Sequence, residues 1–348
     1  MKTITIIIPA WHRPDLTRRC IEFIQRQTLP SSDWEIIVVE NEAQSDSILP
    51  DPLPENTTRI ELPANEGTTG SINRAVAATS SKYLLLLNND IELDPTYLAV
   101  LVGTLERDVR LGFAAGKLLR ATQRTHLDGA GDAMLLGGGA YRLGSMDEDR
   151  GQFDRGVPIL TGCGAAVLYR REAFEQCGGL DVDFFAYLDD IDLGLRAQLI
   201  GYGGAYVPEA VAYHIGSATS GSVVHPRILE LVTRNQIWLL AKDYPPEVVE
   251  KHRYRMLLFQ AMWFGFVVRH GGLGAYLRGI RGARAKLPEM HRKRAELARR
   301  HRISDADFES LLRKSERQVW EWHSSRPPKA QSGLLKIYFR IFGAPVSG

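Results

Sequence analysis

Long hydrophobic runs and cysteine are both scarce in this sequence of 348 residues. No apolar stretch reaches the roughly 20 residues that span a bilayer, so we expect no membrane-spanning helix. Only three cysteines are present, Cys20, Cys163 and Cys177, and their spacing suits neither a disulfide framework nor a structural metal site. We therefore expect a reducing, cytoplasmic setting in which all three pack as small hydrophobic side chains.

An excess of charge is also lacking, because the formal net charge is only +2. The charge balance thus gives no reason to expect nucleic acid as a partner. Internal repeats and the GxGxxG dinucleotide fingerprint are absent too. The composition that remains, 44% hydrophobic and 24% charged, is ordinary for a soluble globular protein, and 348 residues suffice for two domains or one domain with an appendage.

Several short apolar runs in the first half of the chain end abruptly in polar residues. The clearest is Tyr83–Leu87, one tyrosine and four leucines, which is typical of a strand buried on both faces in the middle of a parallel sheet. Open α/β sheets bind ligands at the carboxyl ends of their strands. Two interpretations of Asn88-Asn89-Asp90 therefore stay open: Asp90 binds a divalent metal that holds phosphate, or the three residues only form a turn.

Two glycine-rich segments punctuate this pattern of strands and helices. The first, Asn65 to Val76, precedes an expected helix, which suggests backbone amides near a phosphate or ribose. The second, residues 121–158, is expected to be a substrate loop or lid, with a mobile surface loop as the alternative. The order of elements predicts a nucleotide-binding α/β half-domain.

A pair of adjacent acids, Asp189 and Asp190, precedes a helix predicted from about Asp190 to Ile200. Capping of the helix explains one of these acids but not both. Two like charges so close together raise the pKa of one carboxyl and can create a general base. His214 ends the last expected strand, where a structural histidine is the commoner outcome for that residue type alone.

Together these motifs resemble those of the family 2 glycosyltransferases, inverting enzymes of the GT-A fold, and are most similar to their rhamnosyltransferase-type branch. The resemblance covers about residues 1–240. Its motifs are Ile7-Ile8-Pro9 with Arg13, Val38-Val39-Glu40-Asn41, Asn65-Glu66-Gly67 with Gly70 and Asn73, Leu87-Asn88-Asn89-Asp90, Thr161-Gly162, Gly179-Leu180-Asp181 with Phe184-Phe185, Asp189–Leu193 with Arg196, and Tyr206–Ala210 with His214 and Gly216-Ser217.

The resemblance implies an α/β, Rossmann-like GT-A nucleotide-diphospho-sugar transferase fold over residues 1–225, followed by a helical C-terminal region over residues 226–348. It implies that Asp90 and His214 hold Mn²⁺ or Mg²⁺. It also implies that Asp190 is the catalytic base, with Asp189 the acid before it. The residues implied to contact the nucleotide are Pro9, Ala10, Arg13, Glu40, Asn65, Gly67, Asn73 and Asn88.

Two motifs depart from the family pattern, and one is assigned to the sugars. Glu40 replaces the usual aspartate, which keeps the carboxylate one methylene further out. Asn88 replaces the first acid of an Asp-any-Asp motif, so it is expected to contact nucleotide rather than metal. Thr161 and Gly162 are implied to lie near the donor or acceptor sugar.

The activity implied is metal-dependent inverting transfer from a nucleotide-diphospho-sugar, dTDP-rhamnose first and a UDP-hexose second, to a cell-surface polysaccharide or lipid-linked glycan. One rival is a sugar nucleotidyltransferase, which would need a basic, glycine-rich loop after the first strand, unlike Pro9 to Pro14. The other is a non-catalytic nucleotide-sugar-binding or membrane-scaffold protein on the same fold, whose function would survive Asp190→Asn.

The C-terminal third, from about Arg227, is apolar and basic. The stretch Met256 to Val268 is flanked by arginines, as in a helix that lies in a membrane interface. Such a helix would place the protein peripherally on the inner face of the cell membrane. A helical packing domain or a homo-oligomer interface with a solvated basic face explains the pattern equally well.

Overall fold

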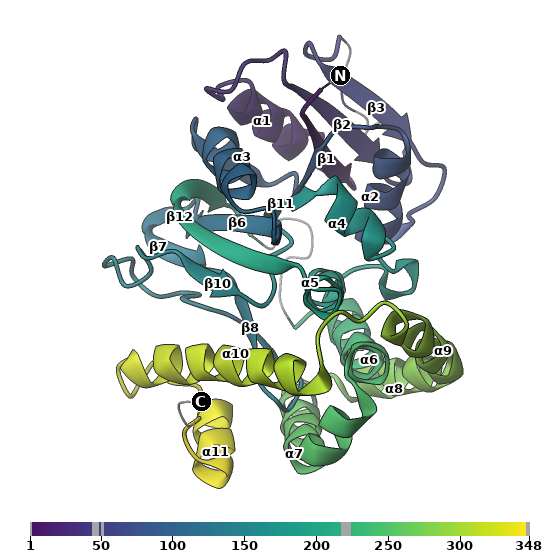
Figure 1. The fold of residues 1–348 in the computed structure, drawn as a ribbon, viewed down its shortest axis with the longest axis vertical. Coiled ribbons are helices and arrows are strands. Elements are labelled where there is room, and N and C mark those ends of the chain that lie inside the picture. The colour runs from purple at the N-terminus through teal and green to yellow at the C-terminus, as the bar shows by residue number, and fades with distance from the viewer. Residues whose placement is uncertain (1, 44–48, 50–51, 217–223, 346–348) are drawn as a thin grey trace.

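The computed structural model describes residues 2–43, 49, 52–216 and 224–345 (Figure 1). Its core is a ten-stranded mixed sheet. The strands of this sheet are β1 (Ile4–Ala10), β2 (Trp34–Glu40), β3 (Thr57–Glu61), β4 (Tyr83–Leu87), β5 (Ile91–Leu93), β6 (Leu111–Arg120), β7 (Gln123–Gly129), β10 (Val157–Ile159), β11 (Ala166–Arg170) and β12 (Gly203–His214). Their order is β10-β12-β6-β11-β4-β1-β2-β3, with β5 paired to β12 and β7 to β6.

The predicted strand Tyr83–Leu87 is confirmed as β4, and all five of its residues are buried. It pairs in parallel with β1 but antiparallel with β11, so the expectation of a wholly parallel setting is wrong on one side. The physical reason is that a continuous apolar run reports burial on both faces, which every central strand shares, and not the direction of its neighbours.

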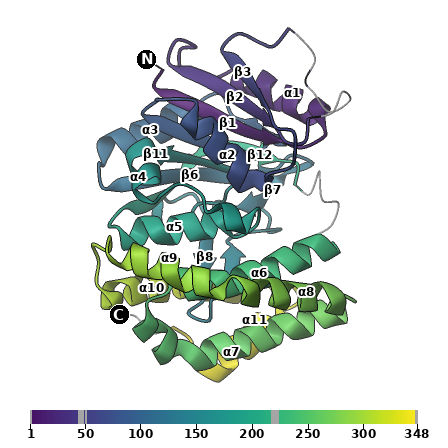
Figure 2. The same ribbon diagram turned by 90° about the vertical axis from the view of Figure 1, so that its right-hand side faces the viewer.

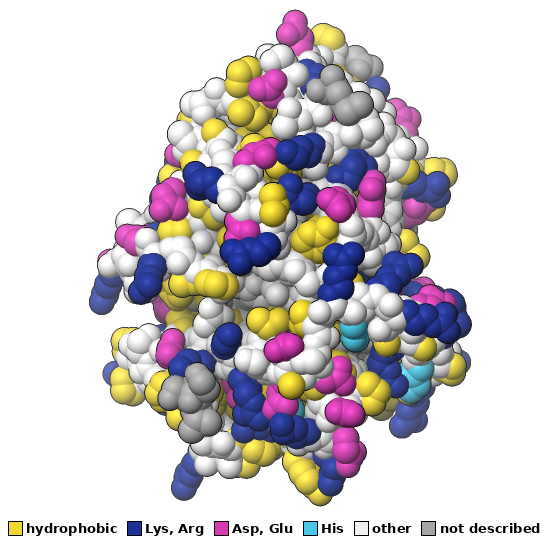
Figure 3. Space-filling view, viewed as in Figure 1, with side chains coloured by type: hydrophobic (Ala, Val, Ile, Leu, Met, Phe, Trp, Pro, Cys, Tyr) yellow, Lys and Arg dark blue, Asp and Glu magenta, His cyan; other side chains and the backbone are white. Residues whose placement is uncertain are grey.

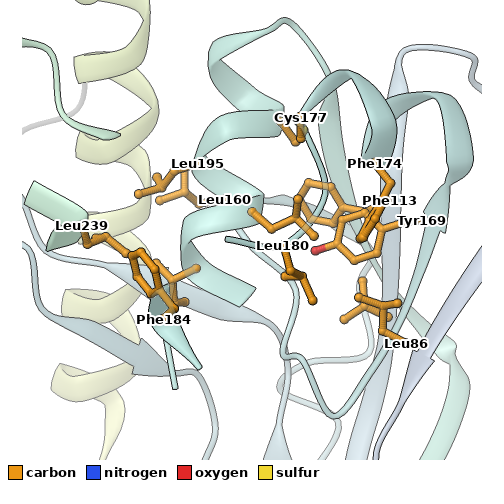
Figure 4. Close-up of a cluster of buried hydrophobic side chains, with 14 of the residues drawn as sticks. Leu86, Phe113, Leu160, Tyr169, Phe174, Cys177, Leu180, Phe184, Leu195 and Leu239 are labelled. Carbon is orange, nitrogen blue, oxygen red and sulfur yellow. The ribbon is translucent and has the colours of Figure 1, made fainter. Parts of the chain in front are cut away.

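Helices cover both faces of the sheet. One face packs on α1 (Pro14–Ile24) and α3 (Tyr97–Arg107), with Cys20 and Leu101 in a shared apolar cluster. The other packs on α2 (Gly67–Ala77), α4 (Arg171–Gln176) and α5 (Asp189–Leu199). The prediction that the three cysteines pack as small hydrophobic side chains is confirmed, since all three are buried and free. Figure 4 shows α5 seated over sheet residues such as Phe113 and Tyr169.

The start of α1 is set by a proline and not by a capping aspartate. Arg13 is the N-cap residue, Pro14 is the first helical residue, and Asp15 lies inside the first turn in an ion pair with Arg13. Proline has the backbone angle of a helix already fixed and needs no N–H donor there, so the helix begins one residue before the aspartate.

Residues 121–158 do not form the irregular loop that the sequence predicted, and a contact of this segment with substrate stays a prediction. The segment contains β7 and a separate hairpin of β8 (Asp132–Met134) and β9 (Ala140–Arg142). The glycine-rich tip of this hairpin packs tightly: a Cβ on Gly139 would lie 2.3 Å from the Phe259 ring, and one on Gly137 would lie 2.8 Å from the Arg255 carbonyl. The glycines therefore serve close packing rather than mobility.

The C-terminal region is helical and lies at the end of the molecule opposite β1–β3 (Figure 2). Its helices are α6 (Pro226–Asp243), α7 (Pro246–Arg269), α8 (Leu273–Ala285), α9 (Leu287–Ala298), α10 (Asp305–Ser325) and α11 (Gly333–Phe342). Across the described ranges, none of the helices has the length and apolarity required to cross a membrane. Leu239 of α6 joins Leu195 of α5 in one buried cluster, so these helices share a core with the sheet region.

Candidate active site

Asp90 and His214 come together because β5 pairs with the end of β12. The register places Ile91 opposite His214, so the residue before β5 and the last residue of β12 become neighbours. Asp90 Oδ1 lies 3.4 Å from His214 Nε2, and both side chains are mostly buried. Two residues more than a hundred positions apart thus meet at the edge of the sheet that the strand-end motifs predicted.

The second ring nitrogen of His214 is held by an acid that the sequence did not single out. His214 Nδ1 lies 2.7 Å from Asp128 Oδ2, and Arg142 donates to the same oxygen at 2.8 Å. Burial favours the neutral imidazole, but the hydrogen bonds to Asp128 and Asp90 outweigh it and raise the pKa of His214 to about 9. A carboxylate on Nδ1 orients the ring so that Nε2 faces Asp90, the arrangement typical of metal-binding histidines.

The separation of Asp90 and His214 fits two ligands of one divalent ion. A carboxylate oxygen and an imidazole nitrogen 3.4 Å apart are close enough that both would reach one ion, and both are donors that Mn²⁺ or Mg²⁺ accepts. Within the described residues, no group of three or more acidic, His or Cys side chains could hold an ion. Two protein ligands suit an ion whose other positions are filled by phosphate and water.

Asp190 is held by backbone N–H groups at the start of α5. Its Oδ2 accepts from Gly164 N at 2.9 Å and its Oδ1 from Ile191 N at 2.9 Å. The N-terminus of a helix also stabilises negative charge. Gly164 permits this contact because a Cβ there would lie 3.0 Å from Asp190 Cβ, so the Thr161-Gly162-Cys163-Gly164 turn orients the carboxylate.

Asp189 has a different environment from its neighbour. Burial and the charge of Asp190 raise the pKa of Asp189 to about 8. Asp189 therefore carries a proton at neutral pH while Asp190 is supplied with two N–H donors. The prediction that one carboxyl of the pair has a raised pKa is confirmed, and Asp189 is that carboxyl.

The backbone before Asp189 is strained, and α6 holds it in place. Phe185, Tyr187 and Leu188 have φ angles of 65°, 68° and 61°, a backbone region that residues other than glycine seldom adopt. Asn235 Nδ2 donates to the carbonyls of Ala186 at 2.9 Å and Tyr187 at 2.7 Å. Such strain persists where surrounding contacts fix it, and functional sites are where it concentrates.

The α5 helix is also fixed by a buried ionic network. Lys242 of α6 bonds Asp181 Oδ2 at 2.7 Å and also contacts Asp192. Arg196 Nε donates to Asp192 at 3.1 Å, one turn along α5. Because buried ion pairs with several hydrogen bonds fix one geometry, this network sets the position of the helix that begins at Asp189.

Asp132 of the β8–β9 hairpin is a buried acid close to the site. Burial raises its pKa to about 7, and the charges of Asp190 and Asp128 add to this rise while Arg142 opposes it. Arg142 Nε lies 3.7 Å from Asp132 Oδ1. The hairpin thus places a cation among the acids that surround the site.

The remaining predicted nucleotide contacts near the strand ends lie at or just after the ends of β1, β2 and β4. Pro9 and Ala10 end β1, and Asn88 follows β4, with its N–H bonded to the Ala165 carbonyl at 2.9 Å. Arg13 is exposed; its bond to Asp15 raises its pKa, with a further contribution from Asp90. Glu40 is buried, accepts from Leu49 N at 2.7 Å, and lies 3.9 Å from Arg59 Nε.

Other predicted contacts are engaged with the protein itself. Asn65 accepts from Gly67 N at 2.8 Å, where a Cβ on Gly67 would lie 2.3 Å from the Phe185 carbonyl. Asn73 bonds both the N–H and the carbonyl of Leu180, at 3.1 and 2.7 Å.

The two residues assigned to the sugars lie in the turn before β11. Thr161 is fully buried, and Gly162 packs on Val167. Ligand contacts by Asn65, Gly67, Asn73, Thr161 and Gly162 stay predictions.

The arrangement of sheet and helices is that of the GT-A glycosyltransferase fold. The crystal structure of GalNAc-T7 with UDP, GalNAc and Mn²⁺ aligns with a TM-score of 0.51 at 13% identity, over 73% of this chain and 55% of that one. The family model described as glycosyltransferase like family 2 matches residues 2–236. The chain therefore belongs to glycosyltransferase family 2.

Curated relatives support the same family. The O-antigen biosynthesis protein RfbC of Myxococcus xanthus is 27% identical over 251 residues, which is 70% of this chain and 19% of that protein. The N-acetylglucosaminyl-diphospho-decaprenol L-rhamnosyltransferase of Mycobacterium tuberculosis is 28% identical over 194 residues, 48% of this chain and 61% of that protein. The match thus spans less than two thirds of each relative.

Proposed function

We propose that this protein is a metal-dependent inverting glycosyltransferase. The observation that carries the proposal is the pairing of Asp90 with His214 at one side of the site and the fixed carboxylate of Asp190 at the other. The donor is a nucleotide-diphospho-sugar, with dTDP-rhamnose favoured and a UDP-hexose second. The acceptor is a sugar on a growing cell-surface polysaccharide or lipid-linked glycan, which the names of the two relatives support.

Asp190 is the base in this proposal. Its two backbone hydrogen bonds fix the carboxylate, which takes the proton from the acceptor hydroxyl as that oxygen attacks the sugar. Asp189 keeps its own proton and adds no second negative charge. A single displacement with no protein nucleophile inverts the anomeric centre.

The nucleotide side uses the other strand ends. Asp90 and His214 would hold Mn²⁺ or Mg²⁺, which would neutralise the charge of the diphosphate leaving group. Arg13, exposed and close enough for Asp90 to raise its pKa, offers a second cation to the diphosphate. Pro9, Ala10 and Asn88 line the strand ends where the nucleoside is expected.

The test is thermal unfolding with a panel of nucleotide-sugars, with and without Mn²⁺. A ligand at a hundred times its Kd stabilises the folded protein by about 2.7 kcal/mol, so the preferred donor should raise Tm by a few degrees, more with the ion. Asp90→Ala and His214→Ala should each remove the Mn²⁺-dependent part. The proposal fails if no nucleotide-sugar stabilises the protein, and the metal site fails if both variants respond to Mn²⁺ as the natural protein does.

A further inference from the structure

Acidic residues are missing from two stretches of the C-terminal region. The chain contains 41 aspartates and glutamates, yet none lies between Tyr254 and Pro288, and none follows Glu321. These stretches include most of α7, all of α8 and all of α11. An acid-free surface that retains lysine and arginine has a partner of negative charge as its natural complement.

The outer side of α7 is apolar over three turns. From Leu257 to Val268, the exposed residues of this helix are Leu257, Ala261, Phe264, Gly265 and Val268. Leu257 is 63% exposed, Phe264 42% and Val268 41%. Their spacing of three and four residues places them on one stripe of the helix. The opposite side is buried through residues such as Phe259.

Neighbouring helices extend this stripe into a continuous surface. On α8, Leu277 is 57% exposed, and Phe264 packs against Tyr276 with ring centroids 5.0 Å apart. On α11, Ile337 and Ile341 are 48% and 57% exposed. Figure 2 shows α7, α8 and α11 together at the end of the molecule away from β1–β3. We call the exposed surface of these three helices the basal face.

A groove between α7 and α11 belongs to the basal face. Its volume is about 470 Å³, and its lining includes Ala261, Gly265, Leu334, Ile337, Arg269 and His270. Small residues on α7 open the groove, and an arginine and a histidine lie at the C-terminal end of that helix. The groove therefore offers apolar surface next to positive charge.

Several cations on the basal face have no carboxylate partner among the described residues. Arg278 is paired with Glu230 at 2.8 Å, but Arg269, Arg281, Arg284 and Arg340 form no ion pair with any of the residues that the structure describes. Figure 3, viewed as Figure 1, shows hydrophobic and basic side chains at the lowest edge of the molecule, with acidic side chains beside them. These arginines remain available to an external anion.

We propose that the basal face docks on the surface of an anionic lipid bilayer. Helices with an apolar stripe flanked by cations bind in the headgroup region through buried apolar area and attraction to anionic lipids. A second copy of this chain fits less well, since a symmetric dimer would bring the unpaired arginines of two identical faces together. This inference goes beyond the proposed function, because docking on lipid requires no donor sugar.

The experiment is flotation of the full chain with vesicles of phosphatidylcholine alone and of phosphatidylcholine with phosphatidylglycerol. The protein should float with the anionic vesicles and release as salt rises. The variant Leu257→Gln/Leu277→Gln/Ile341→Gln should weaken this binding about tenfold or more, because it replaces a strongly exposed apolar side chain on each of the three helices. Because these side chains are exposed, the triple variant should fold as the natural protein does.

A matched control replaces an exposed cation and an exposed apolar residue far from the basal face. Arg107→Glu/Val109→Gln, at the connection of α3 to β6, should bind vesicles as the natural protein does, whereas Leu277→Gln/Arg281→Glu on α8 should not. If the triple variant is less stable than the natural protein in thermal unfolding, this second variant tests the proposal in its place. The proposal is overturned if the natural protein floats with neither vesicle, if the basal variants bind normally, or if light scattering shows a dimer that those variants convert to monomer.

Discussion

At the residue scale, the two adjacent aspartates at the start of α5 have different surroundings. Asp190 accepts hydrogen bonds from two backbone N–H groups, and Asp189 is buried with a pKa raised to about 8. Residue type and spacing predicted that one acid of the pair would be perturbed. They did not predict which, because burial and the N–H of Gly164 depend on segments distant in sequence.

Asp189→Asn should change how stability depends on pH. In the folded protein Asp189 keeps its proton up to about pH 8, whereas in the unfolded chain it loses it near pH 4. Folding is therefore weakened as pH rises between these values, by about 1.4 kcal/mol per pH unit from this group alone. Removing the carboxyl should make the free energy of unfolding fall less steeply between about pH 4 and pH 8. Urea unfolding at several pH values in this range measures the change.

The control is Asp108→Asn. Arg110 lowers the pKa of Asp108 to about 2, so this carboxylate is charged in both states above about pH 5 and contributes no slope there. An Asp189→Asn variant whose stability falls with pH as steeply as that of the natural protein contradicts the assignment.

Asp128→Asn should weaken metal binding, although Asp128 is not one of the two proposed ligands. Loss of the carboxylate that orients a metal-binding histidine typically costs 10–100-fold in affinity, and about that loss is expected here for Mn²⁺. Calorimetric titration with Mn²⁺ in the presence of nucleotide gives the affinity, and Asp108→Asn is again the matched change on the surface. Equal Mn²⁺ affinity in Asp128→Asn and the natural protein would show that His214 needs no such support.

At the element scale, strands and helices with clear hydrophobic patterns were predictable and the hairpin of β8 and β9 was not. The apolar run Tyr83–Leu87 predicted β4, and the helical spacing of apolar residues after Asp189 predicted α5. The run Gly137-Gly138-Gly139 carries no periodic signal, and its partners on α7 and α11 lie more than a hundred residues later. Asp128, one strand earlier, was overlooked because the whole segment was interpreted as a loop.

Gly139→Ala should destabilise the protein. The added Cβ would lie 2.3 Å from the Phe259 ring, so the hairpin or α7 must shift, at a cost of about 1–3 kcal/mol. Gly265→Ala on α7 is the matched control, because a Cβ there meets nothing within 4 Å and alanine favours a helix by up to about 1 kcal/mol. Urea unfolding of both variants decides the matter: equal stabilities would mean that the hairpin tip is not tightly held.

At the scale of the whole molecule, the C-terminal helices support the site as well as presenting the basal face. Asn235 and Lys242 of α6 hold the backbone before Asp189 and the α5 helix itself. The turn between β4 and β5 supplies Asp90, the end of β12 supplies His214, and α5 supplies Asp190. The resemblance predicted Asp90, His214 and Asp190 as site residues. Only the fold shows that α6, in the C-terminal region, holds α5 and therefore Asp190 in place.

The central claim is that Asp190 is the base of a single inverting displacement. Its most direct test is an NMR-monitored transfer reaction with the donor that best stabilises the protein, Mn²⁺ and a short glycan-lipid acceptor. The natural protein should form a product of inverted anomeric configuration. Asp190→Asn should react about 10²–10⁴-fold more slowly while still binding donor. Unchanged transfer by Asp190→Asn, or a product that retains the donor configuration, would contradict the account.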